Sequence, residues 1–249
     1  MSKNHLGTDV NDCSLEFIDR GYTDNLLLAP GWASDKGIFK NLDLEFNYFL
    51  IDQVPDPAAD HSCLAQFETL VVTALERSQP HPLYAMGYSM GGFLLANLPP
   101  HISRRLASVS LVSVRKRYPS LSINTIITLL KRNKEAYLLK FFQRCFVSKE
   151  AFACFKQNIF PRYCEQFSLD YLINTLLVLK QLEITPDHLA QLPELTILHG
   201  AKDTIAPVSE VRKLIEGRPH KRMDKGWSTI HLAILENEGH IFTPRHINK

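Results

Sequence analysis

The sequence predicts an α/β protein with a mostly parallel central sheet, flanking helices and an inserted helical cap. Short apolar runs rich in β-forming residues alternate with stretches of helical periodicity, which is typical of right-handed β–α–β connections. Most of these runs are apolar throughout, which indicates strands covered on both faces. The stretch 120–192 has helical periodicity only, and this predicts the insertion. At 249 residues, the chain is long enough for one large domain of this kind.

The expected strands are short apolar runs bounded by turn-forming residues. In chain order they are Leu15–Ile18, Asn25–Ala29, Tyr48–Ile51, Leu83–Met86, Ala107–Val114, Leu195–Leu198 and Thr229–Leu235. Helices are expected between them, over Ser62–Arg77, Gly91–Leu98 and Pro207–Glu216. Pro207 suits the first turn of its helix because that position needs no backbone donor.

The predicted cap interrupts the alternation of strands and helices. Its apolar residues recur at helical spacing in INTIITLLKR (123–132), EAYLLKFFQRCF (135–146) and LDYLINTLLVLKQL (169–182). The expected organisation is therefore a core formed by 1–119 and 193–249, with the cap over 120–192. We find no internal repeat and no low-complexity tract.

Composition favours an ordinary globular protein and excludes several other classes. The chain is 45% hydrophobic and 22% charged, with a net charge of +2, so no overall charge favours nucleic acid or a membrane surface. No 18 apolar residues run together, and the N-terminus lacks the apolar segment of a signal peptide. The five cysteines form no CxxC pair, which favours reduced thiols over disulfides or a metal site. We therefore expect a cytoplasmic protein.

Positive charge is concentrated in and just before the cap. Between Arg115 and Glu150 there are nine basic residues and two acidic ones, a net charge of +7, although the whole chain carries only +2. Such a surface attracts an acidic partner, but it is also compatible with a solvated helix face. Both interpretations remain open. No nucleic-acid-binding motif accompanies the charge.

The sequence Gly87-Tyr88-Ser89-Met90-Gly91-Gly92 is the strongest indication of chemistry. It directly follows one expected strand and directly precedes an expected helix. Small residues two positions before and after Ser89 allow the tight turn that raises a nucleophilic hydroxyl above a sheet. The helix N-terminus that follows offers N–H groups to an oxyanion. Ser89 is therefore the candidate nucleophile.

A serine nucleophile needs a base to accept its proton and an acid to orient that base. In folds with this turn, the chain order is serine, acid, histidine. Asp203 lies in the loop after the strand Leu195–Leu198, where the acid is required. The alternative place, after Val114, is occupied by Arg115-Lys116-Arg117 and offers no acid.

Four histidines follow Asp203 along the chain: His220, His231, His240 and His246. His240 comes after the last expected strand through a loop that ends in glycine, and it is the preferred base. His231 lies within that strand, and His246 is the reserve candidate. His199, directly after its strand, is expected to have a structural role.

An oxyanion hole requires two N–H donors. One is expected from Met90, the residue after the nucleophile. The other is expected from Trp32, because Pro30 has no N–H and Gly31 permits a tight turn in this loop. The Trp32 indole would then form a wall of the site.

Taken together, PGW (30–32), GYSMGG (87–92), HGAKD (199–203) and EGH (238–240) resemble the α/β-hydrolase superfamily over nearly the whole chain. Within it, the chain looks like the BioH-type esterases, which cleave the methyl ester of pimeloyl-acyl-carrier protein in biotin synthesis. Two departures are Pro30, where most relatives have histidine, and the nine residues after His240, where relatives continue with a helix.

The resemblance implies a Ser89/Asp203/His240 triad, with Trp32 and Met90 at the acyl carbonyl. It also implies an acyl channel lined by the segment containing Phe142, Arg144 and Phe146, and an acidic carrier protein bound by basic cap residues. No metal and no organic cofactor is implied.

The expected function is therefore that of a serine carboxylic-ester hydrolase acting on pimeloyl-acyl-carrier-protein methyl ester. A general short-chain carboxylesterase or thioesterase would use the same triad and differ in pocket shape. A catalytically silent binding protein of the same fold is a further alternative, although such proteins usually lack a triad member.

Overall fold

The computed structural model describes residues 14–57, 62–216 and 230–242. Its centre is a seven-stranded sheet in the order β1-β3-β2-β4-β5-β6-β7, in which only β1 pairs antiparallel. The strands are β1 (Leu15–Ile18), β2 (Asn25–Ala29), β3 (Asn47–Ile51), β4 (Leu83–Tyr88), β5 (Val109–Val112), β6 (Leu195–Gly200) and β7 (Ile230–Leu235). The predicted mostly parallel α/β architecture is confirmed.

The strand ends nearest the predicted nucleophile differ from the expected ones. β4 continues to Tyr88, which pairs with Val112, and β6 continues to Gly200, which pairs with Leu235. β5, by contrast, is shorter than the predicted Ala107–Val114, because Ser113 has a φ of 53° and turns the chain out of the strand. Thr229, the expected first residue of β7, lies outside the described residues.

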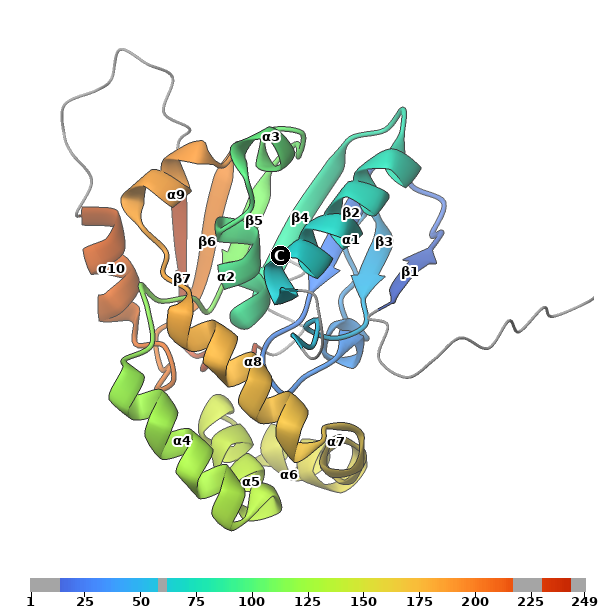
Figure 1. The fold of residues 1–249 in the computed structure, drawn as a ribbon. Helices are drawn as coiled ribbons and strands as arrows, with labels where there is room; N and C mark the ends of the chain where they lie inside the picture. Colours follow the sequence, from blue (N-terminus) through green and yellow to red (C-terminus); the bar gives the residue numbers. More distant parts are fainter. Residues whose placement is uncertain (1–13, 58–61, 217–229, 243–249) are drawn as a thin grey trace, which may run out of the picture.

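Helices of the core lie over the sheet as the sequence predicts (Figure 1). The predicted ones are α1 (Cys63–Ser78), α2 (Met90–Ala96) and α10 (Val208–Glu216), and the short α3 (Pro100–Ser103) was not predicted. α1 begins at Ser62, whose hydroxyl accepts a hydrogen bond from the Ala65 amide at 3.0 Å. A one-turn 3₁₀ helix, η1 (Lys36–Phe39), follows β2.

Six helices lie between β5 and β6, and within the described residues of this segment there is no strand. They are α4 (Ser120–Arg132), α5 (Lys134–Cys145), α6 (Lys149–Asn158), α7 (Phe160–Gln166), α8 (Leu169–Gln181) and α9 (Pro186–Gln191). We call Ser120–Gln191 the helical insertion. Side-chain caps at Asn133, Ser148, Ser168 and Thr185 separate its helices. In Figure 1, α4 to α7 lie beyond the carboxyl ends of the parallel strands.

A continuous apolar cluster joins the sheet to the insertion. It extends from Phe49 and Phe67 between the sheet and α1, through Trp32, to Phe142 and Tyr163 in the insertion. No described helix is long and apolar enough to cross a membrane.

A buried polar contact also fixes the insertion to the core. The carboxylate of Asp35, only 2% exposed, accepts a hydrogen bond from the Tyr163 hydroxyl at 2.8 Å and pairs with Arg162 at 2.8 Å. The same carboxylate accepts from the Gly37 amide and so caps η1. The insertion is therefore held to the sheet by apolar packing, by a hydrogen bond to a buried carboxylate and by an ion pair whose arginine is half-exposed.

Candidate active site

Ser89 lies in the turn between β4 and α2, in a conformation that non-glycine residues rarely adopt. Its φ is 49° and its ψ is −111°. A Cβ added to Gly87 would lie 2.6 Å from the backbone of Gly91, so a larger side chain there would push the turn open. The Ser89 amide donates to the Val112 carbonyl at 2.8 Å, which ties the turn to β5. The local packing thus requires the small residues that the sequence places around Ser89.

The structure brings Ser89, His240 and Asp203 together from three separate loops at the carboxyl edge of the sheet. Nε2 of His240 lies 3.0 Å from Oγ of Ser89, and Nδ1 lies 2.7 Å from Oδ2 of Asp203. A carboxylate can only accept, so Nδ1 carries the proton and Nε2 is left to accept the serine hydroxyl proton. All three residues are buried. This arrangement would allow Ser89 to act as a nucleophile, with His240 as its base and Asp203 as the acid that orients the base.

The carboxylate of Asp203 has partners for both oxygens. Oδ1 accepts from the amides of Ile205 and Ala206 at 2.7 and 2.8 Å, and Oδ2 faces His240. His199 supports this loop, because its Nε2 donates to the Ala206 carbonyl at 2.6 Å. Burial lowers the pKa of His199, which favours a neutral ring beside Asp203. This placement agrees with the structural role expected for His199.

The backbone of His240 is held from three sides. Its carbonyl accepts hydrogen bonds from the hydroxyls of Tyr88 and of Ser113, the latter at 2.9 Å. The next amide, that of Ile241, donates to the Cys145 carbonyl at the end of α5 at 2.9 Å. Burial raises the pKa of Tyr88 well above its usual value, so its hydroxyl remains a donor. These contacts fix the ring that faces Ser89.

The two residues expected to form the oxyanion hole both lie beside Ser89. Met90 follows it at the start of α2, and a Cβ added to Gly31 would lie 3.1 Å from the Ser89 Cβ. Trp32, the next residue, packs its ring edge-on against Phe141, with centroids 5.0 Å apart. Its indole donates to the Leu172 carbonyl at 3.1 Å, so the ring forms a fixed wall of the site, as expected.

A cavity of about 490 Å³ opens at Ser89 between the sheet and the insertion. Its walls include Trp32, Tyr118, Ile126, Tyr137, Phe141 and Leu176, together with Arg115 and Arg144. Burial and the nearby Asp203 carboxylate raise the pKa of Tyr118. The Tyr118 hydroxyl is therefore a neutral hydrogen-bonding group next to the candidate nucleophile.

The expected acyl-channel residues Phe142 and Phe146 do not line this cavity, and that part of the prediction is wrong. Phe142 is 1% exposed and packs against Phe155, with ring centroids 4.6 Å apart. Phe146 packs against Phe155 as well, at 5.2 Å. Successive residues of a helix point about 100° apart, and it is Phe141, adjacent to Phe142, that faces the cavity together with Tyr137. Only Arg144 of the three predicted residues is on its wall.

Several of the basic residues that the sequence groups together have partners within the molecule. Arg115 pairs with Glu210 at 3.4 Å, and Lys116 pairs with Glu183 at 3.3 Å. Lys134 donates to two carbonyl groups at the end of α7, and Arg144 donates to the Thr204 carbonyl at 2.9 Å. The exposed basic side chains with no such bond among the described residues are those of Arg117, Lys131, Arg132, Lys140 and Lys149.

Four residues of the site were not predicted as site residues from the sequence: Tyr88, Ser113, Tyr118 and Arg115. Tyr88 lies inside the serine motif, but its hydroxyl acts on His240, a residue 152 positions away. Ser113, Arg115 and Tyr118 all follow β5, at the edge where the strands end. A polar residue directly after a parallel strand next to the nucleophile strand is the signal that could have found them.

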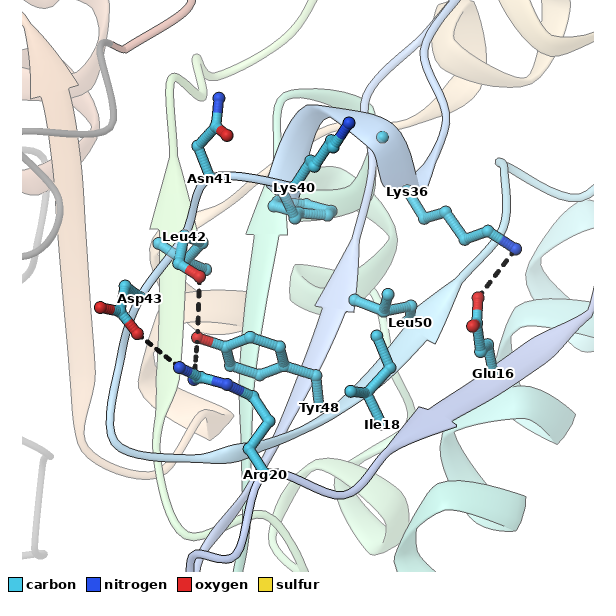
Figure 2. Close-up of a pocket in the computed structure, with 12 residues that line it drawn as sticks. Glu16, Ile18, Arg20, Lys36, Lys40, Asn41, Leu42, Asp43, Tyr48 and Leu50 are labelled. Atoms are coloured by element: carbon cyan, nitrogen blue, oxygen red, sulfur yellow. Dashed lines mark hydrogen bonds and ion pairs between the residues drawn. The ribbon is translucent and has the colours of Figure 1, made fainter.

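A second cavity, of about 580 Å³, lies away from these residues, beside β1 and η1 (Figure 2). Its charged groups largely satisfy one another: Arg20 binds Asp43 and Tyr48, and Lys36 binds Glu16. Burial opposes the charge of Lys36, but its acidic neighbours outweigh that effect and raise its pKa. None of the predicted site residues lines this cavity. The described residues also contain no cluster suited to a metal ion.

No protein-family model and no curated protein matches the chain. Solved structures do match over nearly its whole length. An esterase from Exiguobacterium antarcticum is 17% identical, with a TM-score of 0.71 over 91% of this chain and 87% of the other. The chain has the α/β-hydrolase fold.

Other structures with this fold have different activities. A bromoperoxidase from Bacillus anthracis is 15% identical, with a TM-score of 0.70 over 91% of this chain and 87% of the other. The enol-lactonase from Burkholderia xenovorans LB400 is 14% identical, with a TM-score of 0.68 over 91% and 89%. Similarity to an esterase, a bromoperoxidase and a lactonase establishes the α/β-hydrolase fold, and the reaction must be argued from the site.

Proposed function

We propose that the protein is a serine carboxylic-ester hydrolase in which Ser89 is the nucleophile, His240 the base and Asp203 the orienting acid. One observation carries this proposal, namely the continuous chain of hydrogen bonds from Asp203 through His240 to Ser89. The chain ends in a cavity large enough for a small acyl group. A silent binding protein would have no need of this arrangement.

In the proposed reaction, Ser89 Oγ attacks the ester carbonyl while Nε2 of His240 accepts the hydroxyl proton. The Asp203 carboxylate stabilises the resulting imidazolium. The amides of Met90 and Trp32 bind the oxyanion of the tetrahedral intermediate. His240 then gives its proton to the leaving alcohol, and an acyl-enzyme remains. Water, activated by the same ring, hydrolyses the acyl-enzyme, so that one ester and one water yield one acid and one alcohol.

Within this class, we propose the methyl ester of pimeloyl-acyl-carrier protein as the physiological substrate, as the resemblance to BioH-type esterases implies. The mainly apolar and aromatic cavity walls suit a methylene chain. The exposed basic side chains of α4 to α6 suit an acidic carrier, which they would attract and orient. Biotin synthesis would place the protein in the cytoplasm.

The surface that would bind the carrier protein, which we call the carrier surface, includes only some of the basic residues between Arg115 and Glu150. Arg115, Lys116 and Lys134 already have partners in the molecule, so they add less to an encounter with an acidic protein. Lys140 lies on the exposed side of α5 without such a partner. We therefore assign the carrier surface to Lys140 and the similarly exposed cations around it.

Genetic complementation tests the substrate most directly. The gene should restore growth without biotin to a cell that lacks its own pimeloyl-ester esterase, and the Ser89→Ala variant should fail to do so. A purified enzyme that hydrolyses p-nitrophenyl butyrate yet fails to complement would instead be a general carboxylesterase.

The carrier surface has a separate test. Lys140→Glu should lower kcat/KM for the carrier-bound methyl ester, more at low than at high salt. Turnover of p-nitrophenyl butyrate should change little, because that ester needs the triad but no carrier surface. An equal loss on both substrates would contradict the assignment of Lys140.

A further inference from the structure

The cavity beside Ser89 contains positive charge, and none of the described residues that line it is acidic. The two charged residues that line it are Arg115 and Arg144. Most of the remaining wall is aliphatic or aromatic, so charge is screened less there than in open solvent. An acyl group without charge would form no ion pair with these two arginines.

Arg115 is largely buried, with a side chain only 16% exposed, and its hydrogen bonding is incomplete. It donates to the Ile205 carbonyl at 3.3 Å and to the Glu210 carboxylate at 3.4 Å, both long for bonds from a charged donor. Its Nε is buried and has no hydrogen-bond partner. A buried cation with unused donors is costly unless a further partner completes it.

The position of Arg115 relates it to the reacting serine. Its guanidinium lies over the ring of Tyr118, 5.0 Å from the ring centroid. Arg115, Tyr118 and Ser89 all line the same cavity of about 490 Å³. A short acyl chain bound in this cavity can therefore extend from Ser89 toward the cation.

Arg144, on α5 of the insertion, binds the same loop of the core as Arg115 does. Its guanidinium donates to the Thr204 carbonyl at 2.9 Å, and Arg115 donates to the carbonyl of the next residue, Ile205. The two guanidinium groups thus meet at one turn of the chain, one from the core and one from α5. Arg144 uses only one of its donors there and is exposed, so the others can bind a ligand.

We infer that the cavity selects esters whose acyl chain carries an anionic group, bound by Arg115 with Arg144 beside it. This inference rests on the proposed ester hydrolysis and names its substrate class. The required chemistry is an oxygen anion at a distance from the scissile carbonyl. A half-ester of a dicarboxylic acid supplies it as a carboxylate, and a carrier arm supplies it as a phosphodiester.

Binding to the Ser89→Ala variant tests this inference without requiring turnover. Calorimetry compares monomethyl adipate with methyl heptanoate, an uncharged ester of similar length. We expect the anionic ester to bind at least about tenfold more tightly, since hydrogen bonds to a charged group contribute more than neutral ones. Adding Arg115→Gln should remove this preference, whereas Arg117→Gln, a matched change at an exposed arginine, should preserve it.

A second pair of probes identifies the source of the anion. It compares the methyl-pimeloyl thioester of 4′-phosphopantetheine with the same thioester of pantetheine, which lacks the phosphate. If monomethyl adipate binds more tightly than methyl heptanoate and the difference depends on Arg115, the anion is the carboxylate of a dicarboxylic half-ester. If instead the phosphopantetheine thioester binds more tightly than the pantetheine thioester, again through Arg115, the anion is the phosphate of the carrier arm. Arg144→Gln and Arg115→Lys provide further variants in case Arg115→Gln fails to fold.

Two results would overturn the inference. One is equal binding of the charged and uncharged members of both pairs, and the other is a preference that the arginine substitutions leave intact. Failure of the proposed function would give a different result, namely a wild-type protein that binds the probes but hydrolyses none of them.

Discussion

The carboxyl edge of the sheet and the helical insertion contribute to the site in different ways. At the sheet edge, Asp203 and His240 are bound through backbone amides, carbonyls and buried hydroxyls, so that few of their polar atoms lack a partner. On the insertion, Tyr137 and Phe141 offer side-chain surface to the cavity, and Arg144 makes one bond to the core. The sheet edge fixes the proposed catalytic groups, whereas the insertion forms much of the cavity wall around them.

This difference has a consequence for substitutions. At the sheet edge, the loss of the Asp203 or His240 side chain would remove a proposed catalytic group that no neighbouring residue can replace. Where packed side chains form a wall, the loss of one changes volume and affinity but leaves the reacting groups in place. Changes at the sheet edge should therefore lower kcat, and changes on the cavity wall should mainly raise KM.

The largest effect is expected from Ser89→Ala. Without the nucleophile, ester turnover should fall by about 10⁴-fold or more, and a fluorophosphonate probe should label only the wild type. Equal labelling of both proteins would contradict the assignment of Ser89. Thermal unfolding of the variant serves as the control that the fold is intact.

Next in size are His240→Ala and Asp203→Asn, which should each lower kcat by about 10³-fold or more, since a triad acts as a unit. The matched control is His246→Ala, because His246 is the reserve candidate for the base and lies outside the described residues. If that variant lost activity while His240→Ala retained it, the assignment of the base would be wrong.

Neighbouring phenylalanines of α5 provide a direct comparison of core and wall. Phe142→Ala should lower the free energy of unfolding by about 3–5 kcal/mol, because it empties a buried aromatic cluster. Phe141→Ala should instead raise KM for a long acyl ester by roughly tenfold with kcat little changed, because it removes part of the cavity wall. Denaturant unfolding and steady-state kinetics on both variants measure the contrast, and equal effects on stability would contradict it.

A smaller effect is expected where the His240 backbone is held. Ser113→Ala removes one donor to the His240 carbonyl, and Tyr88→Phe removes the other. Each should lower kcat by about tenfold with little change in KM, since the ring loses support while the cavity is unchanged. Ser110→Ala, on β5, is the control, and a rise in KM alone would speak against a positioning role.

The smallest effect concerns pH and His199. Burial lowers its pKa below the usual 6.5, so its contribution to stability is fully present above that value and is lost as the pH falls toward the lower folded pKa. Urea unfolding should show a lower free energy of unfolding for the wild type at pH 5.5 than at pH 7.5. His199→Gln retains a donor for Ala206 and should reduce that decrease, whereas an unchanged decrease would exclude His199 as its cause.

The sequence by itself determined the fold class and the candidate triad because both rest on local rules. Glycines around Ser89 are needed for a turn that lies within six residues, and Asp203 and His240 follow strands whose apolar runs are visible in the chain. Parallel strands bring such loops to one edge, so chain order was enough to indicate which side chains meet.

Only the tertiary structure decided which side chains form the cavity. The insertion is a run of amphipathic helices, and periodicity alone does not tell which part of an apolar face meets the sheet and which meets another helix. The resemblance to BioH-type esterases led us to expect Phe142 and Phe146 at the cavity, where Tyr137 and Phe141 are found instead. The same holds for Arg115, whose place on the wall of that cavity depends on the turn at Ser113, because a residue with positive φ changes the direction of the chain after it.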